Sequence, residues 1–203
     1  MEIIIEPAIG ASEMAAIRRV RRQVFAREMG ITLPPITADR SATFHLLARH
    51  GIGGEVVAAL SVVETSGDGE LHQRYGLDFP PGARIARYTQ LAVLRPFRGL
   101  DQPLKLILEA HRRFVAPGLF NYTWLLFDAD RAATSNLRRR LAFEPGAQVY
   151  LTEYGRSRAL TRDEASPLAR TAIRRAAEFV AETSPAYYAP TGMTLAPVRG
   201  SAI

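Results

Sequence analysis

A basic segment joins an apolar run to a helical pattern near the middle of the chain. The segment "LAVLRPFRGLDQPLKLILEA", residues 91–110, starts with strand-forming residues, turns at Pro96 and Gly99, and continues with apolar residues at helical spacing. A helix that begins directly after a strand directs its free backbone N–H groups outward, where they bind phosphate and other anions. Arg95 and Arg98 add positive charge there. The pattern predicts an anion-binding loop, and an ordinary strand-to-helix turn at Pro96 is the alternative.

Arginine gathers in two other places. Arg21 and Phe25 lie one turn apart in the helical pattern of residues 10–30, and a guanidinium can bind a carboxylate through two parallel hydrogen bonds. Residues 138–140 are all arginine, which suits phosphate groups or the acidic surface of a protein. A solvated helix face is the alternative for both clusters.

The composition limits the possible classes of protein. With 203 residues, of which 47% are hydrophobic, the chain is long enough for one well-packed domain. Cysteine is absent, which excludes disulfides and cysteine metal sites, and the four histidines lack the spacing of a metal motif. No metal is expected for that reason. The net charge of +6 indicates acidic ligands, with base composition of the gene as the alternative explanation. The sequence has no recognisable targeting segment and no membrane-length apolar run, so a cytoplasmic protein is expected.

Periodicity and turn residues predict a mixture of strands and helices. Strands are predicted at residues 2–8, in a hairpin at 43–65, and at 84–94, 121–130 and 147–155. Helices are predicted at 10–30, with Ser12 as N-cap and Gly30 as the end, through Lys105 and Phe114, and at 132–143. Residues 66–84 are predicted to form a long loop with at most one helical turn. This order predicts an α/β (α+β) fold in which helices pack on a mixed, mainly antiparallel sheet.

The pattern changes after residue 155. Residues 161–184 predict an amphipathic helix whose core side carries Leu168, Ile173, Ala177 and Val180, and a proline-rich tail follows. We therefore expect one domain at residues 1–155 and a C-terminal helix and tail at 156–203 that pack on or beside it. Covering a cleft and mediating dimerisation are alternative roles for this extension.

The central segment resembles the GNAT superfamily of N-acyltransferases. In that family a strand of the type "xLAV" leads into a loop of the type "RGxGxG" and a helix of the type "xLL", and the loop amides hold the pyrophosphate of coenzyme A. "QLAVLRPFRGLDQPLKLILEA" is similar to these three parts, and "TWLLFDADRAATSNLRRRLAFEPG" is similar to the next strand and helix. The resemblance covers residues 1–155 and implies a GNAT-like sheet, acyl transfer and a thioester co-substrate.

The resemblance also implies which residues bind the acyl donor. A backbone N–H near Leu91 or Val93 bonds the thioester carbonyl in such proteins, while the pantetheine arm pairs like an added strand. The donor-binding positions implied in this sequence are Leu91, Val93, Arg98, Gly99, Leu100, Asp101, Gln102, Leu104, Asn136 and Arg138.

Three positions depart from the common family pattern. Asp101 and Pro103 replace the two later loop glycines, and Arg138 stands where many acetyltransferases have the tyrosine that protonates the leaving thiolate. Another proton donor, or water, must then serve.

These departures and the first helix resemble one branch of the superfamily, the acyl-homoserine lactone synthases and N-acyl amino acid synthases. The branch opens with a helix of the type "RxxVFxxE", here Arg21 to Glu28, and commonly takes a fatty acyl chain from acyl carrier protein. Lactone synthases usually place an acidic residue and an arginine three apart on the central strand, where this chain has Arg87 and Gln90. A different amine acceptor, such as an amino acid, is therefore expected.

Amide formation from a thioester needs a neutral amine, a polarised carbonyl and a path for one proton. Strict alternation along "RYTQLAV" predicts that Tyr88, Gln90 and Ala92 share one face of the strand, and that Arg87, Thr89, Leu91 and Val93 share the other. The candidates for acceptor contacts or for holding a proton-relay water are Tyr88 and Gln90, and the candidate base is Glu64. Arg21 and Phe25 are the candidates for acceptor binding. An ordinary structural role is the alternative for each.

The expected function is N-acyl transfer from acyl-CoA or acyl-acyl carrier protein, used as co-substrate rather than as a tightly bound cofactor, to a small-molecule amine. Two alternatives stay open: an acetyl-CoA-dependent N-acetyltransferase, and a catalytically degenerate GNAT-fold protein that only binds a ligand. A nucleic-acid partner is not expected, because no recognition motif accompanies the basic runs. The chain length of the acyl group, its carrier, the amine, and the choice between monomer and homodimer stay undetermined.

Overall fold

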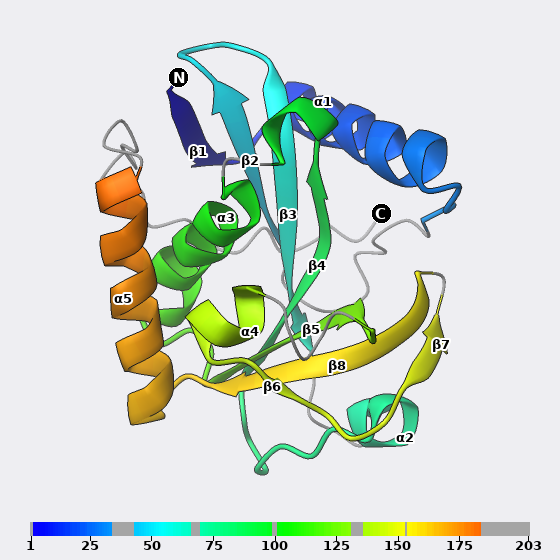
Figure 1. The fold of residues 1–203 in the computed structure, drawn as a ribbon, viewed down its shortest axis with the longest axis vertical. Helices are drawn as coiled ribbons and strands as arrows, with labels where there is room; N and C mark the ends of the chain where they lie inside the picture. The colour runs from blue at the N-terminus through cyan, green and yellow to red at the C-terminus, as the bar shows by residue number, and fades with distance from the viewer. Residues whose placement is uncertain are drawn as a thin grey trace.

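The computed structural model describes residues 2–33, 43–65, 70–98, 101–130, 136–152 and 154–183. Figure 1 shows the strands and helices of these segments. The strands are β1 (Ile3–Pro7), β2 (Thr43–His50), β3 (Val56–Thr65), β4 (Ile85–Val93), β5 (Tyr122–Asp128), β6 (Glu144–Pro145), β7 (Tyr150–Thr152) and β8 (Gly155–Asp163). They form one sheet in the order β1-β2-β3-β4-β5-β8-β6, and β7 also pairs with β8. Every pairing is antiparallel except β4 with β5, so the mixed, mainly antiparallel sheet is confirmed.

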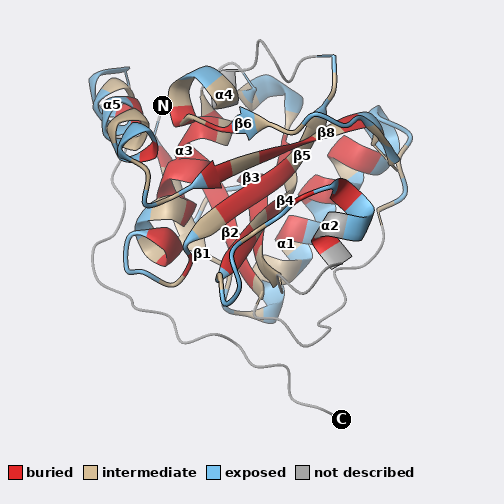
Figure 2. Cartoon of the chain, turned by 90° about the horizontal axis from the view of Figure 1, so that it is seen from below, coloured by how far each residue is buried: buried red, intermediate tan, exposed pale blue. Residues whose placement is uncertain are grey.

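Helices cover both faces of the sheet. One face carries α3 (Gln102–Ala110), α4 (Asn136–Leu141) and α5 (Pro167–Thr183), and the other carries α1 (Ala11–Arg21) and α2 (Glu70–Tyr75), as Figure 2 shows. Two of these helices continue in a π-helical segment: α1 in η1 (Arg22–Glu28) and α3 in η3 (His111–Val115). A short 3₁₀ turn, η2 (Arg95–Phe97), follows β4. The two-sided covering explains why β3 and β4 are rich in apolar residues on both faces.

Apolar clusters lie on both sides of the sheet. The larger one lies under α3 and α5 and includes Leu106, Ile107 and Val180. The one under α1 and η1 includes Ile17 and Phe25 packed on β2, β3 and β4. The apolar sides of α1, η1 and α3 therefore face the sheet.

The two ends of the first helix are set by different residues. The predicted N-cap Ser12 is wrong, because the N-cap is Gly10, two residues earlier, and Ser12 already lies inside the helix. The Glu13 carboxylate accepts a hydrogen bond from the backbone N–H of Gly10 at 2.9 Å and satisfies that donor. At the other end Gly30 has φ +69°, so the predicted end at this glycine is confirmed.

The strand β8 was not predicted, and it lies beyond the boundary expected at residue 155. It runs along the whole of β5, from Tyr122 opposite Asp163 to Asp128 opposite Ser157. The arginines of β8 interrupt its apolar pattern, so its sequence looks like that of a polar connection. Arg162 is nevertheless buried, because its guanidinium forms an ion pair with Glu164. The sheet therefore continues past residue 155.

The C-terminal helix packs on the same core. α5 begins at Pro167, since residues 161–163 belong to β8. Its buried residues are Ala169, Ala176 and Val180, so the predicted core residues Leu168 and Ala177 are wrong: both are exposed, and the buried stripe lies one position away. The proline-rich tail lies outside the described residues.

Candidate functional site

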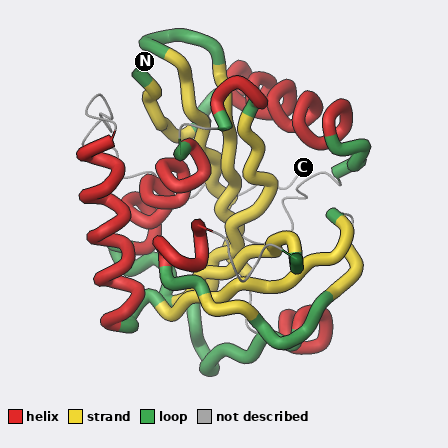
Figure 3. Tube along the Cα trace, in the orientation of Figure 1, coloured by secondary structure: helices red, strands yellow, loops and turns green. Residues whose placement is uncertain are grey.

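The parallel strands β4 and β5 separate partway along their length. They pair only from Ile85 opposite Tyr122 to Tyr88 opposite Leu125. Beyond this point β4 stays with β3 and β5 stays with β8, each for several more residues. Figure 3 shows the two parts of the sheet running in different directions. The end of β4 therefore has one edge that no neighbouring strand pairs with among the described residues.

A β-bulge lies at the point of separation. Thr89 pairs with Ser61 and Ala92 pairs with Ala59, so two residues of β4, Gln90 and Leu91, stand opposite one residue of β3. Gln90 has φ +50°, a left-handed conformation that is uncommon outside glycine. The extra residue reverses the alternation of side chains along the rest of the strand.

The bulge makes the predicted arrangement of faces wrong. Tyr88 is buried in the cluster under α3, whereas Ala92 is buried in the cluster under α1. Val93 shares the α3 side with Tyr88, and Leu91 packs against the same cluster. Strict alternation would have placed Tyr88 with Ala92 and opposite Val93.

A pocket of about 430 Å³ lies beside the bulge on the α1 face. Its lining comes from α1, η1, the segment after η1, β2 and β4: Met14, Arg18, Arg21, Arg22, Phe25, Ala26, Ile31, Thr32, Leu33, His45 and Gln90. The structure thus brings together Arg21 and Phe25, the candidates for acceptor binding, and Gln90, the candidate for an acceptor contact or for holding a relay water. The lining contains no carboxylate. Its polar residues are the three arginines, Thr32, His45 and Gln90, and its other residues are apolar.

Arg21 is buried at the base of this pocket with only 8% of its surface exposed. Its Nη2 donates to the Ser61 hydroxyl at 2.6 Å and its Nε donates to the Gln90 carbonyl at 3.3 Å. Burial lowers the pKa of Arg21 to about 10, so the side chain stays charged at neutral pH. Among the described residues no carboxylate forms an ion pair with it. A buried cation with only neutral partners is costly, and an anionic ligand would offset that cost.

Sequence reasoning missed two polar residues of this site. Ser61 of β3 is fully buried and pairs directly with His45 of β2. The His45 Nδ1 lies 2.6 Å from the Ser61 hydroxyl. Burial, and to a lesser extent the Arg21 charge, lower the pKa of His45 to about 4. The register of the predicted hairpin could have placed this pair together, but neither residue belongs to a recognisable motif.

A tyrosine from the other half of the sheet also approaches the pocket. Tyr154 lies in the turn between β7 and β8, and its ring packs edge-on against Phe25 with 6.0 Å between centroids. This contact links η1 to the β7–β8 hairpin across the separated strands. This contact could not be predicted from local patterns, because it depends on β8, which was not predicted.

The basic corner after β4 is organised around Arg98. Its Nε donates to the Val93 carbonyl at 3.0 Å, and its Nη2 lies 2.5 Å from the Glu28 carboxylate. Arg98 therefore ties the end of β4 to the end of η1, and part of its charge is neutralised. Its side chain is 45% exposed and stays accessible to a ligand.

The start of α3 presents backbone more than side chains. Asp101 precedes the helix with φ +52°, and the side chains of Gln102 and Leu104 are buried. Gly99 and Leu100, also predicted to bind the donor, lie outside the described residues.

Comparison with solved structures shows what this arrangement resembles. FeeM, an N-acyl amino acid synthase from uncultured soil microbes, has a TM-score of 0.60 at 12% identity, over 83% of this chain and 96% of its own. BjaI, a CoA-dependent acyl-homoserine lactone synthase, has a TM-score of 0.60 at 17% identity, over 87% and 89%. Escherichia coli ElaA has a TM-score of 0.58 at 16% identity, over 80% and 100%. The chain has the GNAT fold. No protein-family model and no curated protein matches the sequence.

Within the GNAT fold, Tyr88 and Glu64 lie away from the Arg21 pocket. The Tyr88 ring is 4% exposed on the α3 face, and burial raises the pKa of its hydroxyl, which keeps it neutral. Glu64 stands opposite Ala86, and its carboxylate is 3.8 Å from the Arg84 guanidinium. The structure therefore does not bring either residue together with Gln90 and Arg21.

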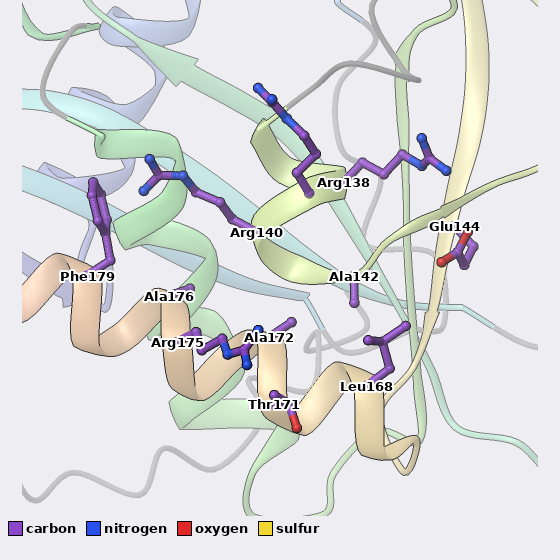
Figure 4. Close-up of a pocket in the computed structure, with 11 residues that line it drawn as sticks. Arg138, Arg140, Ala142, Glu144, Leu168, Thr171, Ala172, Arg175, Ala176 and Phe179 are labelled. Atoms are coloured by element: carbon purple, nitrogen blue, oxygen red, sulfur yellow. The ribbon is translucent and has the colours of Figure 1, made fainter.

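The arginines of residues 138–140 border a cavity of about 590 Å³ between α4 and α5. Figure 4 shows that Arg138 points away from α5, whereas Arg140 extends toward Phe179. The Arg140 guanidinium lies over the Phe179 ring at 3.7 Å. The side chain of Asn136, the first residue of α4, is outside what the structure describes. Arg138 and Arg140 therefore point in different directions, and neither lines the Arg21 pocket.

The described segments contain neither a metal-binding cluster nor a membrane-spanning helix. No group of three or more histidine, aspartate or glutamate residues could hold a metal ion there. No helix in those segments combines the length and apolarity needed to cross a membrane.

Proposed function

We propose that this protein is an N-acyltransferase that moves an acyl group from a pantetheine thioester to the amine of a small molecule bearing a carboxylate. The observation that carries the proposal is the separation of β4 from β5 at the Gln90 bulge, directly beside a pocket with a buried arginine. The open strand edge suits the donor, and the pocket suits the acceptor. Acyl-CoA or an acyl-acyl carrier protein serves as co-substrate.

The donor side rests on the edge of β4 along which no described strand pairs, and on the corner that follows it. A pantetheine arm contains two amides and can pair with a strand edge as an added strand does. A backbone N–H near Leu91 or Val93 would then polarise the thioester carbonyl. Arg98 and the first turn of α3 stand at the end of that edge, where the phosphate of the arm would lie.

The nature of the donor follows from the same corner. Asp101 and Pro103 occupy positions where glycines would leave more amides free and bring no negative charge. This weakens the fit to the pyrophosphate of coenzyme A, while the surrounding arginines suit an acidic carrier protein. We therefore propose a long acyl chain on acyl carrier protein as the preferred donor.

The acceptor side rests on Arg21. Its guanidinium is fixed by Ser61 and the Gln90 carbonyl and still has N–H groups to offer to a carboxylate. The apolar lining, which includes Phe25 and Leu33, would hold the rest of the acceptor. An amino acid has the required amine and carboxylate one carbon apart.

The reaction depends mainly on holding the amine of the acceptor next to the thioester carbon of the donor. The neutral amine attacks the thioester carbon, the C–N bond forms, the C–S bond breaks, and the thiolate leaves. The amine loses one proton and the thiolate gains one. Because Arg138 replaces the usual tyrosine acid, water is the proposed donor to the thiolate, and the Gln90 side chain is the proposed contact for the acceptor or a relay water.

Product analysis tests the proposal. The purified protein is incubated with acyl-CoA or acyl-acyl carrier protein and a mixture of amino acids, and new N-acyl amino acids are identified by mass spectrometry. We expect a product that depends on the protein and on a free amine. Tight binding of donor and acceptor without any product would instead identify a degenerate GNAT-fold ligand-binding protein.

A further inference from the structure

Arg21, Ser61 and His45 form a continuous chain of hydrogen bonds at the base of the α1-face pocket. The Arg21 Nη2 donates to the Ser61 hydroxyl, and the same hydroxyl lies 2.6 Å from the His45 Nδ1. The three residues come from α1, β3 and β2, and Ser61 is completely buried between the other two. The His45 ring also lines the pocket.

Arginine sets the direction of the first of these bonds. A guanidinium can only donate, so the Ser61 oxygen accepts from Arg21. The Ser61 proton needs an acceptor of its own, and the His45 Nδ1, 2.6 Å from the hydroxyl, is the acceptor that this chain offers, so we assign Nδ1 as the acceptor. A neutral imidazole with an accepting Nδ1 carries its proton on Nε2. Among the described residues Nε2 has no hydrogen-bond partner, so its N–H is available to a ligand.

We infer that His45, held by Ser61 with its proton on Nε2, is a second hydrogen-bond donor for the acceptor's carboxylate beside Arg21. The inference rests on the proposed function for the identity of the ligand, since that function places a carboxylate in this pocket. It assigns His45 to substrate recognition and not to proton abstraction. An acceptor that lacks the carboxylate would leave both donors without a partner.

The surroundings of His45 support a neutral donor over a base. The charged side chains that line the pocket are Arg18, Arg21 and Arg22 from the helix above, and no carboxylate of the described lining faces the ring. Proton uptake by His45 would therefore add a positive charge next to others. The low pKa of about 4 agrees with this, because the imidazole then stays neutral at physiological pH.

The first test measures the tautomer directly. Nitrogen-15 NMR of the histidine side chains, with His45 assigned by the loss of its signals in a His45→Gln variant, reports which ring nitrogen carries the proton at pH 7. We expect the proton on Nε2. In Ser61→Ala the Nδ1 partner is lost, and a mixture of tautomers is expected. A proton on Nδ1 in the unchanged protein would overturn the inference.

The second test uses benzoate as a probe for the carboxylate and needs no turnover. Replacing His45 with Phe removes the donor, and the Kd for benzoate should rise about 10-fold or more. His45→Gln places an amide N–H near the position of Nε2 and should recover most of the affinity. His50→Gln, at the exposed far end of β2, is the matched control and should change nothing. Equal benzoate affinity in His45→Phe and the unchanged protein would overturn the inference.

Kinetics then separate this inference from the proposed function. If acyl transfer occurs, His45→Gln should keep kcat while His45→Phe raises the acceptor KM, whereas a catalytic base would lose kcat in both variants. A loss of kcat in His45→Gln would therefore overturn the donor role and leave acyl transfer intact. Absence of any acyl product would refute the proposed function, while the tautomer and the benzoate affinity would still decide the role of His45.

Discussion

Replacing Arg21 with methionine should strongly weaken acceptor recognition and leave the fold almost as stable as before. Methionine has a similar length and no charge, so it fills the same volume without the guanidinium. A structural arginine would show the opposite behaviour. The two readouts are therefore the acceptor KM and the free energy of unfolding, measured on the same variant.

The expected magnitudes follow from the contacts of Arg21. A bidentate, charge-assisted bond to a carboxylate contributes about 2–3 kcal/mol, so the acceptor KM should rise roughly 30-fold to 150-fold with kcat nearly unchanged. For stability, the variant loses two hydrogen bonds to neutral oxygens, on Ser61 and Gln90, together worth about 1–3 kcal/mol. It also removes a buried cation without a carboxylate partner, which offsets a similar amount. The net change in the free energy of unfolding should stay within about 1 kcal/mol.

The assay pairs steady-state kinetics over a range of acceptor concentrations with urea unfolding. Arg19→Met is the matched control, because Arg19 lies on the same helix with its side chain 64% exposed and should affect neither readout. If Arg21→Met lowered the free energy of unfolding by 3 kcal/mol or more while the acceptor KM stayed constant, Arg21 would be a structural residue, and the carboxylate-bearing acceptor would lose its main support.

Three further outcomes are expected. Arg98→Ala should weaken donor binding by about 1–3 kcal/mol in titrations. Glu28→Gln frees Arg98 from its ion pair and should preserve donor binding. Unchanged affinity of Arg98→Ala for both coenzyme A and acyl carrier protein would show that Arg98 is not part of the donor site. Long-chain acyl-acyl carrier protein should turn over faster than acetyl-CoA in side-by-side assays, and the reverse preference would defeat the carrier-protein proposal. Glu164→Gln should cost about 3 kcal/mol at pH 7, because it breaks a buried ion pair with Arg162, and the cost should shrink in acid. Burial raises the pKa of Glu164, but hydrogen bonds from His111, Arg162 and Thr123 outweigh burial and lower the pKa below 4.5. The ionised carboxylate therefore stabilises the fold at neutral pH, and this stabilisation is lost as the pH falls below 4.5. The same difference in unfolding free energy between Glu164→Gln and the unchanged protein at pH 7 and at pH 3, measured in urea, would contradict this.

The parts of the fold that were predicted are those with local signals. The stripe of α1, the glycine-rich turn of the β2–β3 hairpin and the apolar run of β5 each carry their information within a few residues. β8 was missed because Arg156, Arg158 and Arg162 give it the composition of a polar connection. Arg162 is buried only because Glu164 and the carbonyl of Leu141 accept its hydrogen bonds, and such a partner cannot be identified before the fold is known.

The candidate site shows the same division between local and long-range information. Arg21 and Phe25 were identified through a motif within one helix, and they do line the pocket. Whether Arg21 is solvated or buried depends on β3 and β4, which lie far from it in the sequence. His45 and Ser61 have no motif, and their pairing follows only from the strand register.

The Gln90 bulge joins the proposed donor and acceptor halves of the site. The extra residue in β4 lies just past the last pair with β5, it reverses the faces of the residues that follow, and the Gln90 carbonyl there accepts a hydrogen bond from the Arg21 Nε. The acceptor arginine is therefore bonded to the same residue at which the open strand edge begins. A displacement of Gln90 would change the donor edge and the position of Arg21 together, so substitutions that remove the bulge should impair both substrates, in contrast to Arg21→Met, which should impair only one.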